Sequence, residues 1–293
     1  IFNPLLWPRS GTLGRRSDMF NPQVFSTIKR IVRQKLTSTR MFIMMPILIL
    51  FIPGMAWGFA DPDIMLPGGV KPESVMEVMF YTSLGVVFAG TMCGVLLAFD
   101  GISKDRFSGV LEVKLSQPMP RKHQSIGIAV GHWFAILIPV WSLWLIATLL
   151  VCYRLGETII ITETISSFIA VALILFWYVI FSLIASTFST DQGTSIAFGV
   201  GMWFLFTFLW ALVTSIVAFA SGVNVGELNN PEMIRIEGFL DLLSPNGVFH
   251  HLLETNLTAI DRGVPPIVSW LAAAVWSVLP WLWFNSRMTK IQP

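Results

Sequence analysis

The chain has 293 residues, of which 54% are hydrophobic and only 12% are charged, and its mean hydropathy is +0.71. A soluble globular domain carries roughly 25% charged residues, so this composition excludes a soluble globule, a disordered chain and a disulfide scaffold. The formal net charge of +2 provides no global basic field for nucleic acid. We therefore expect an all-α membrane protein with no nucleic-acid partner.

Residues 1–40 contain eight Lys and Arg and no apolar core of a signal peptide, which predicts a cytoplasmic N-terminal segment. The motif Phe-Asn-Pro occurs at residues 2–4 and again at 20–22, so we expect the native chain to begin at Met19.

Within this segment, residues 22–38 predict an amphipathic helix that Asn21 can cap. Its apolar face comprises Val24, Phe25, Ile28, Ile31, Val32 and Leu36. Lys29, Arg30 and Arg33 lie off that face, whereas Lys35 intrudes on it. We expect the helix to lie in the inner membrane surface with its basic residues toward anionic headgroups or a partner. A plain membrane anchor is the alternative.

Six apolar segments are long enough to cross a bilayer, which takes about 20 residues. These segments are 41–60, 79–99, 126–152, 165–188, 195–220 and 265–284. Residues 41–293 are thus predicted to form a six-span membrane domain, whose first span should be kinked by Pro46 and Pro53. With the N-terminus inside, the inner segments hold 15 of the 19 Lys and Arg, so both termini are predicted to be cytoplasmic.

Several small features of the spans have a structural interpretation. Gly90-x-x-x-Gly94 in the second span and Gly127-x-x-x-Gly131 in the third permit close helix approach. Cys93 and Cys152 lie in apolar surroundings and are interpreted as packing residues. His132, the one candidate inside a span for an ion relay, is interpreted as a hydrogen-bonded structural histidine.

The inner loop 100–125 predicts a short amphipathic helix. Its apolar residues recur at helical spacing and are Phe107, Val110, Leu111 and Leu115. Charged residues alternate with them, and Pro118 and Pro120 end the pattern. Such a helix can insert an apolar ridge with charged flanks into a groove on a soluble subunit. The alternative is an interfacial helix that only closes the loop.

The outer loop 221–264 predicts two short helices on the outer face of the bundle. Pro231 begins the first, Ser244-Pro245-Asn246-Gly247 breaks the pattern, and the second follows over 248–257. His250 and His251 resemble a metal site, but adjacent residues on a helix point about 100° apart and no third ligand is evident. We interpret them as a solvated pair and expect no metal site.

The chain lacks the motifs of energy-coupling and catalytic chemistry. It contains no Gly-Lys dipeptide, and therefore no phosphate-binding loop of the usual kind for ATP. It contains neither a zinc-protease motif nor a recognisable nucleophile–base pair, so we expect no enzyme activity. The span interiors hold no Asp, Glu, Lys or Arg for an ion relay. Energy for transport should therefore come from another polypeptide.

The inner loop carries the pattern Asp105-Arg106-x-x-Gly109-x-Leu111-Glu112, followed by Leu115, Pro118 and Arg121. This signature, the six spans, the amphipathic helix and the outer helical loop resemble the membrane subunit of an ABC-2 type ATP-binding cassette transporter over residues 20–290. The chain departs from the usual loop in having Pro118-Met119-Pro120 before Arg121, which stiffens the loop exit.

The resemblance implies a half-transporter that forms a homodimer in the lipid membrane, with no cofactor in this chain. A separate ATP-binding subunit would hold ATP and Mg²⁺ and dock on loop 100–125. The implied coupling residues are Asp105, Arg106, Phe107, Gly109, Val110, Leu111, Glu112, Leu115, Pro118 and Arg121, assisted by Lys29, Arg30 and Arg33. Alternatively, Arg106 and Glu112 pair locally or face water.

The resemblance leaves two functions open. The chain is expected to be the permease subunit of an exporter. The alternative is a subunit that transmits ATPase strokes through residues 221–264 to an extracytoplasmic partner, for example in enzyme maturation, without moving a soluble substrate. The cargo is not indicated by the sequence.

Overall fold

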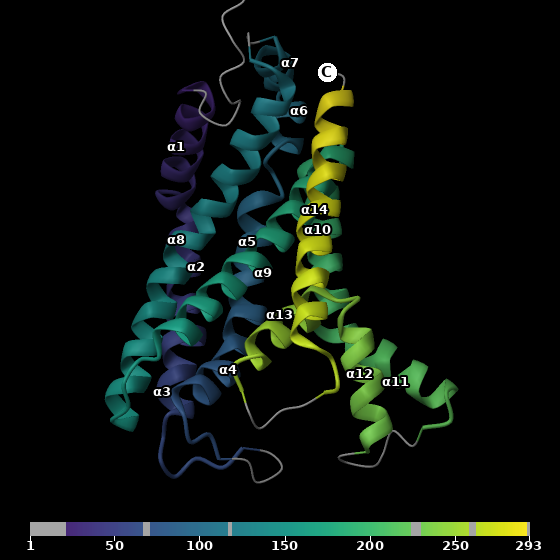
Figure 1. Ribbon diagram of the computed structural model, residues 1–293. Helices are drawn as coiled ribbons and strands as arrows, with labels where there is room; N and C mark the ends of the chain where they lie inside the picture. The colour runs from purple at the N-terminus through teal and green to yellow at the C-terminus, as the bar shows by residue number, and fades with distance from the viewer. Residues whose placement is uncertain (1–21, 67–70, 117–118, 224–229, 258–261, 292–293) are drawn as a thin grey trace, which may run out of the picture.

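The computed structural model describes residues 22–66, 71–116, 119–223, 230–257 and 262–291. The regular secondary structure of these ranges is helical, and six of the helical segments are long and apolar enough to cross a membrane. These segments run side by side as a bundle (Figure 1). The prediction of an all-α, six-span membrane protein is confirmed.

Three of the six spans are continuous α-helices and three contain a short π-helical segment. The continuous ones are α8 (Arg121–Leu155), α9 (Ile161–Phe188) and α14 (Pro266–Lys290), which form spans three, four and six. Span one comprises α2 (Thr39–Ile49), η2 (Leu50–Gly54) and α3 (Met55–Phe59). Span two comprises α4 (Val75–Gly85), η3 (Val86–Gly90) and α5 (Thr91–Ala98). Span five comprises α10 (Gln192–Phe204), η4 (Leu205–Leu209) and α11 (Trp210–Ala220).

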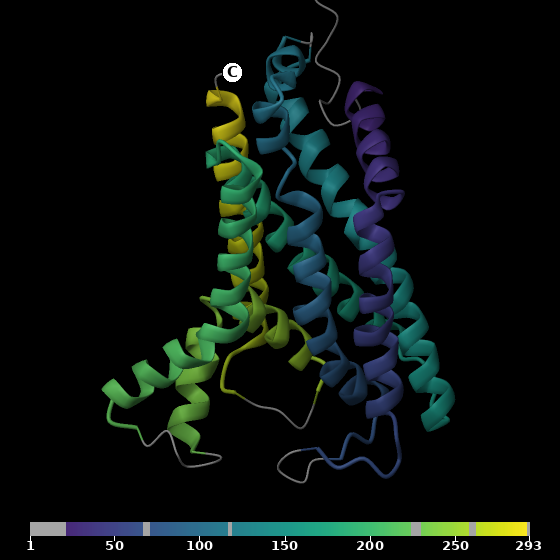
Figure 2. The same cartoon turned by 180° about the vertical axis from the view of Figure 1, so that it is seen from behind.

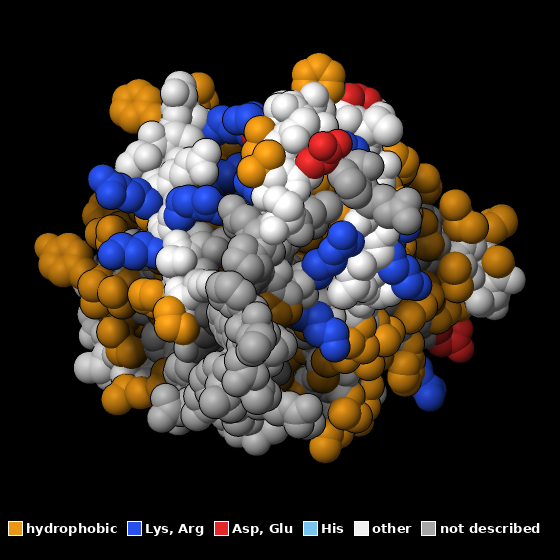
Figure 3. Space-filling view, turned by 90° about the horizontal axis from the view of Figure 1, so that it is seen from above, with side chains coloured by type: hydrophobic (Ala, Val, Ile, Leu, Met, Phe, Trp, Pro, Cys, Tyr) orange, Lys and Arg blue, Asp and Glu red, His pale blue; other side chains and the backbone are white. Residues whose placement is uncertain are grey.

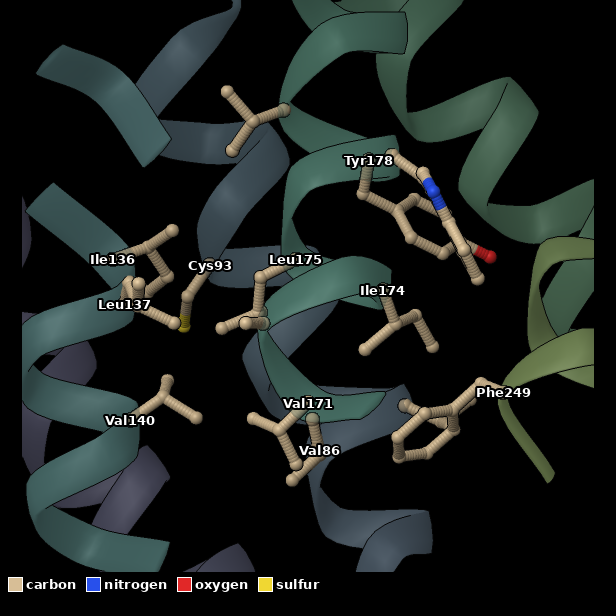
Figure 4. Close-up of a cluster of buried hydrophobic side chains, with 14 of the residues drawn as sticks. Val86, Cys93, Ile136, Leu137, Val140, Val171, Ile174, Leu175, Tyr178 and Phe249 are labelled. Carbon is tan, nitrogen blue, oxygen red and sulfur yellow. The ribbon is translucent and has the colours of Figure 1, made fainter. Parts of the chain in front are cut away.

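The fourth span, α9, occupies the centre of the bundle and packs against α5, α8, α10, α13 and α14. Figure 4 shows Ile174, Leu175 and Tyr178 of this helix among buried side chains from its neighbours. Cys93 points into the same cluster beside Leu137 and is buried, which confirms it as a packing residue.

The prolines of span one remain inside helical structure. Pro46 lies within α2, and Pro53 lies in the π-helical segment η2. Because proline has no N–H, it removes one hydrogen bond from the helix, and a local π-helical turn accommodates such a defect. The carbonyl of Phe51, in the same segment, approaches Gly85 of span two so closely that any Cβ at position 85 would overlap its oxygen. The first two spans are therefore in intimate backbone contact here.

The outer loop forms α12 (Pro231–Asp241) and α13 (Pro245–Glu254). α11 and α12 project from the bundle as an arm (Figures 1 and 2). Both predicted short helices are present, but α13 packs more deeply than expected, because its Val248, Phe249 and Leu252 are fully buried. The predicted break at Ser244 is also the cap of this helix, because its hydroxyl accepts the N–H of Gly247 at 3.4 Å.

His250 and His251 are not a solvated pair, so that prediction is wrong. His251 is buried, with Nε2 3.0 Å from the carbonyl oxygen of Gly238 and Nδ1 3.3 Å from Glu254 Oε2. The ring of His250 packs on that of Phe80 with 5.8 Å between centroids. Both histidines lie on α13, and His251 joins it to α12.

Candidate functional site

The candidate site lies at one end of the bundle, which we call the basic end. It is formed by α1 (Pro22–Leu36), α6 (Ser103–Phe107), α7 (Val110–Leu115) and the C-terminal end of α14. Viewed from above in Figure 3, this end displays more Lys and Arg than Asp and Glu. We call the opposite end, which carries α12 and α13, the far end.

Loop 100–125 contains two short helices instead of the single amphipathic helix that we predicted. Gly109 separates α6 from α7 with φ of 71°, a left-handed conformation that glycine adopts without strain. The helical periodicity therefore does not continue from Phe107 to Leu111. Leu115 ends α7, and Pro118 lies outside the described residues, as do Met19 and the predicted cap Asn21.

The predicted apolar ridge is divided between the interior and the surface. Leu111 is only 5% exposed and packs inward, so it cannot contact a partner as predicted. Phe107, Val110 and Val113 are 74%, 42% and 64% exposed, respectively. We call these three residues the apolar tip. Val113 was missed because an uninterrupted helix would place it off the ridge.

The charged residues of the signature have distinct positions. Asp105 on α6 forms an ion pair with Lys114 on α7, and Glu112 is exposed beside the apolar tip. Arg106 donates from Nη1 to the carbonyl oxygen of Ser189 at 2.6 Å and from Nη2 to that of Thr187 at 3.2 Å. It therefore binds the C-terminal end of α9, where a cation complements free carbonyl groups. The pairing of Arg106 with Glu112, one of the two alternatives, is therefore wrong, whereas Glu112 does face water.

Further hydrogen bonds fix the loop to the spans. The hydroxyl oxygen of Ser186 on α9 accepts the N–H groups of Ile102 at 3.1 Å and Ser103 at 2.9 Å. Gln124 on α8 donates to the carbonyl oxygen of Lys114 at 3.1 Å. Arg121 donates to the carbonyl oxygen of Thr289 at 3.3 Å and holds the end of α14. The loop is thus attached to spans three, four and six.

The amphipathic helix predicted over residues 22–38 forms as α1, and it packs along α8 in the same direction (Figures 1 and 2). A Cβ at Gly127 would lie 3.0 Å from Thr27 Cγ2, and one at Gly131 would lie 2.9 Å from the Cβ of Ile31. The predicted close approach at this Gly-x-x-x-Gly motif is confirmed, with α1 as the partner. Lys29, Arg30 and Arg33 are exposed.

The second motif, Gly90-x-x-x-Gly94, makes looser contacts. A Cβ at Gly94 would meet Val179 of α9 at 3.5 Å, which is ordinary van der Waals distance. The same spacing therefore has different consequences in spans two and three.

An ion-pair network explains why Lys35 interrupts the apolar face of α1. Its Nζ lies 2.7 Å from Asp100 Oδ1, while Arg40 Nη1 lies 2.8 Å from the other carboxylate oxygen. Burial lowers the pKa of Lys35, and the nearby Asp100 opposes this effect. The network joins α1 and span one to the end of span two. In the sequence, the one indication of this network was the position of Lys35 on the apolar face of the amphipathic helix.

Within the part of the chain that the structure describes, no group of three His, Cys, Asp or Glu residues is arranged to hold a metal ion. The chemistry at the basic end is therefore that of ion pairs, hydrogen bonds and exposed apolar side chains. This arrangement can bind another macromolecule and transmit displacement, because the loop that carries the exposed residues is hydrogen-bonded to several spans.

Comparison with known proteins agrees with the resemblance deduced from the sequence. The model of the family described as ABC-2 family transporter protein matches residues 18–284. No match was found among curated proteins.

Proposed function

Because the chain belongs to the ABC-2 family of transporter proteins, we propose that it is the permease subunit of an ATP-driven exporter. A separate subunit binds and hydrolyses ATP with Mg²⁺, and two copies of the chain form the transport unit. The observation that carries the proposal is the apolar tip, exposed on the short helices α6 and α7 and flanked by Glu112.

The tip has the chemistry of a protein-docking site. Exposed apolar side chains with a charged residue beside them match the apolar centre and polar rim of protein interfaces. Arg106 connects the tip to α9, and Gln124 connects it to α8. A subunit that pushes on Phe107 or Val113 consequently displaces these two long spans, and the motion reaches the far end of the bundle.

The distribution of basic residues supports a cytoplasmic location for the tip. At the basic end the described Lys and Arg are Lys29, Arg30, Arg33, Lys35, Arg40, Lys104, Arg106, Lys114, Arg121, Lys122, Arg287 and Lys290. At the far end they are Lys71, Arg154, Arg235 and Arg262. Because cytoplasmic segments are enriched in Lys and Arg, we assign the basic end, with α1 and the end of α14, to the ATP-containing side.

Co-purification with the ATP-binding subunit tests the proposal. The two proteins are produced together and solubilised in mild detergent. Phe107→Asp and Val113→Asp should each abolish co-purification, because a carboxylate at the centre of an apolar contact must be desolvated. Met65→Asp, at a residue 77% exposed near the far end, is the matched control and should retain binding. Leu111→Asp is unsuitable because Leu111 is buried.

The results separate two parts of the proposal. Loss of binding in both tip variants, with retention in the control, supports docking at the tip. Undiminished binding by both tip variants contradicts docking there. A wild-type chain that binds no ATP-binding subunit contradicts the proposal as a whole.

The projecting arm supports the alternative function, in which ATPase strokes act on an extracytoplasmic partner. Leu243, next to α12, is 61% exposed, as expected if the arm contacts such a partner. Under this function Leu243→Asp leaves ATPase stimulation unchanged and abolishes activity in cells. Under the exporter function it preserves both. Deleting residues 231–257 would not discriminate, because α13 belongs to the core.

A further inference from the structure

A polar cavity of about 240 Å³ lies at the basic end, between α1 and the loop helices. Its walls combine residues from α1, α6, α7, α8 and the turn after α5. A single water occupies about 30 Å³ of liquid, so the cavity has room for a phosphate group with a few attached carbons. None of the coupling contacts described above accounts for this space.

The cavity carries excess positive charge. Four basic residues line it, Arg30, Lys35, Lys104 and Lys114, against only two acidic residues, Asp100 and Asp105. Each carboxylate is engaged by one of the lysines, Asp100 by Lys35 and Asp105 by Lys114. Arg30 and Lys104 have no ion-pair partner within the described ranges, and both are exposed at the cavity. They are available to bind an anion.

His132 also lines this cavity. Its side chain is only 3% exposed, and its Nδ1 lies 2.8 Å from the carbonyl oxygen of Ile128. Because a carbonyl oxygen only accepts, Nδ1 carries the proton and Nε2 of the neutral ring is the acceptor. This Nε2 is buried and has no hydrogen-bond partner among the described residues. An unpaired acceptor in such a position is destabilising unless a ligand supplies a donor.

We propose that the cavity binds a phosphate ester that carries a hydroxyl group, with Arg30 and Lys104 holding the phosphate and His132 accepting from the hydroxyl. Two sources share this chemistry, the headgroup of an anionic lipid and a soluble phosphate ester. The lipid is the expected source, because α1 is amphipathic and Phe25 is exposed on it. The ligand then holds α1 against the loop helices, independently of any ATP-binding subunit.

The test uses the purified full chain, freed of lipid in detergent and examined by native mass spectrometry. The probes are phosphatidylglycerol, phosphatidylcholine and glycerol 3-phosphate. Phosphatidylglycerol has both the anionic charge and the hydroxyl donor, whereas phosphatidylcholine is zwitterionic and lacks the donor. The wild-type chain should bind phosphatidylglycerol about tenfold more tightly than phosphatidylcholine.

Variants locate the site. Arg30→Gln and Lys104→Gln should each weaken phosphatidylglycerol binding about tenfold, through loss of one charged hydrogen bond. Arg33→Gln removes the same charge from an exposed position on α1 outside the cavity, and should bind as the wild type does. His132→Phe should reduce the preference for phosphatidylglycerol over phosphatidylcholine. If this buried substitution prevents folding, Arg30→Gln and Lys104→Gln still test whether the cavity is the binding site.

Each outcome bears on the proposal. Weaker binding in Arg30→Gln and Lys104→Gln, but not in Arg33→Gln, supports it. Equal binding in all three variants, or no preference for phosphatidylglycerol over phosphatidylcholine, overturns the lipid site. Saturable binding of glycerol 3-phosphate that is lost in Arg30→Gln supports the cavity chemistry, and overturns the lipid as its source if the phospholipids do not bind.

Discussion

Gly131 shows how little space separates α1 from the membrane domain. A methyl group there would lie 2.9 Å from the Cβ of Ile31, so Gly131→Ala should displace α1 and lower the free energy of unfolding by about 1–3 kcal/mol. The matched control is Gly201→Ala in α10, where nothing lies within 4 Å of the added carbon. It should be neutral or stabilising by up to about 1 kcal/mol. Thermal unfolding in detergent measures both, and equal effects would contradict the close approach.

Asp100 is a second residue at which the structure predicts that a substitution lowers the free energy of unfolding. It is buried and pairs with Lys35 and Arg40, so Asp100→Asn leaves two cations without their counterion. Because Arg40 is partly exposed and solvent screens it, we expect a loss of about 2–4 kcal/mol in unfolding free energy. Asp105→Asn breaks a more exposed pair with Lys114 and should cost at most about 1 kcal/mol. Denaturant titration compares the two, and a smaller effect at position 100 would refute the network's role.

These residues mark how far the sequence could predict the basic end. The Gly127-x-x-x-Gly131 spacing predicted that another helix approaches closely. It did not specify which helix, because the apolar face of α1 and the apolar face of any span could both pack there. Lys35 was visible as a charge on an apolar face, yet its partner Asp100 lies 65 residues away. Long-range ion pairs depend on tertiary packing that periodicity does not encode.

At the scale of elements, α13 introduces a pH dependence at the far end. Burial lowers the pKa of His250 to about 4, although the nearby Glu254 opposes this shift and Arg262 and His251 reinforce it. The folded state therefore binds fewer protons than the unfolded state between about pH 6.5 and pH 4, and stability falls as the pH decreases through that window.

We expect the free energy of unfolding to decrease by about 1–2 kcal/mol between pH 7 and pH 5, from this residue alone. His250→Gln removes the titrating group and should reduce that decrease, while leaving the neutral-pH fold intact. The measurement is thermal unfolding at both pH values for the two proteins. The same pH-dependent loss in His250→Gln would assign the dependence to another group. Glu254 acts only at lower pH, because His251 and Arg262 lower its pKa despite burial.

The two elements that differed from prediction did so for separate reasons. The loop helices were predicted as one because the apolar spacing continues numerically across Gly109, whereas its left-handed conformation rotates α7 and turns Leu111 inward. The helix α13 was predicted only to pack on the outer face because it belongs to a long extramembrane loop. Its apolar residues Val248, Phe249, Leu252 and Leu253 were themselves an indication of deeper burial.

For the whole molecule, hydropathy predicted the number and order of the spans, because crossing a bilayer requires a long apolar segment. It did not predict which spans are central. Lipid-facing and protein-facing helix surfaces are both apolar, so composition cannot distinguish the enclosed α9 from span five, most of which is exposed. Hydropathy also did not predict that α11 and α12 project from the bundle as an arm.

The central position of α9 leads to a prediction about how motion crosses the molecule. Arg106 is the side chain of the loop that links the apolar tip to the end of α9, through the carbonyl groups of Ser189 and Thr187, while Ser186 holds the start of α6. Arg106→Gln leaves the exposed tip in place, so the ATP-binding subunit should still co-purify. The link to α9 is weakened, so displacement of the tip should no longer reach the far end.

Spin labels at Met65 and Leu243, both exposed near the far end, make this measurable by pulsed electron paramagnetic resonance. In the wild-type complex, ATP should change the distance distribution between the labels, and in Arg106→Gln this change should be lost while binding persists. Lys122→Gln, which removes an exposed charge at the same end, is the control and should preserve the change. An unaltered response in Arg106→Gln would show that force reaches the spans through the loop's other attachments, which are Ser186 on α9 and Gln124 on α8.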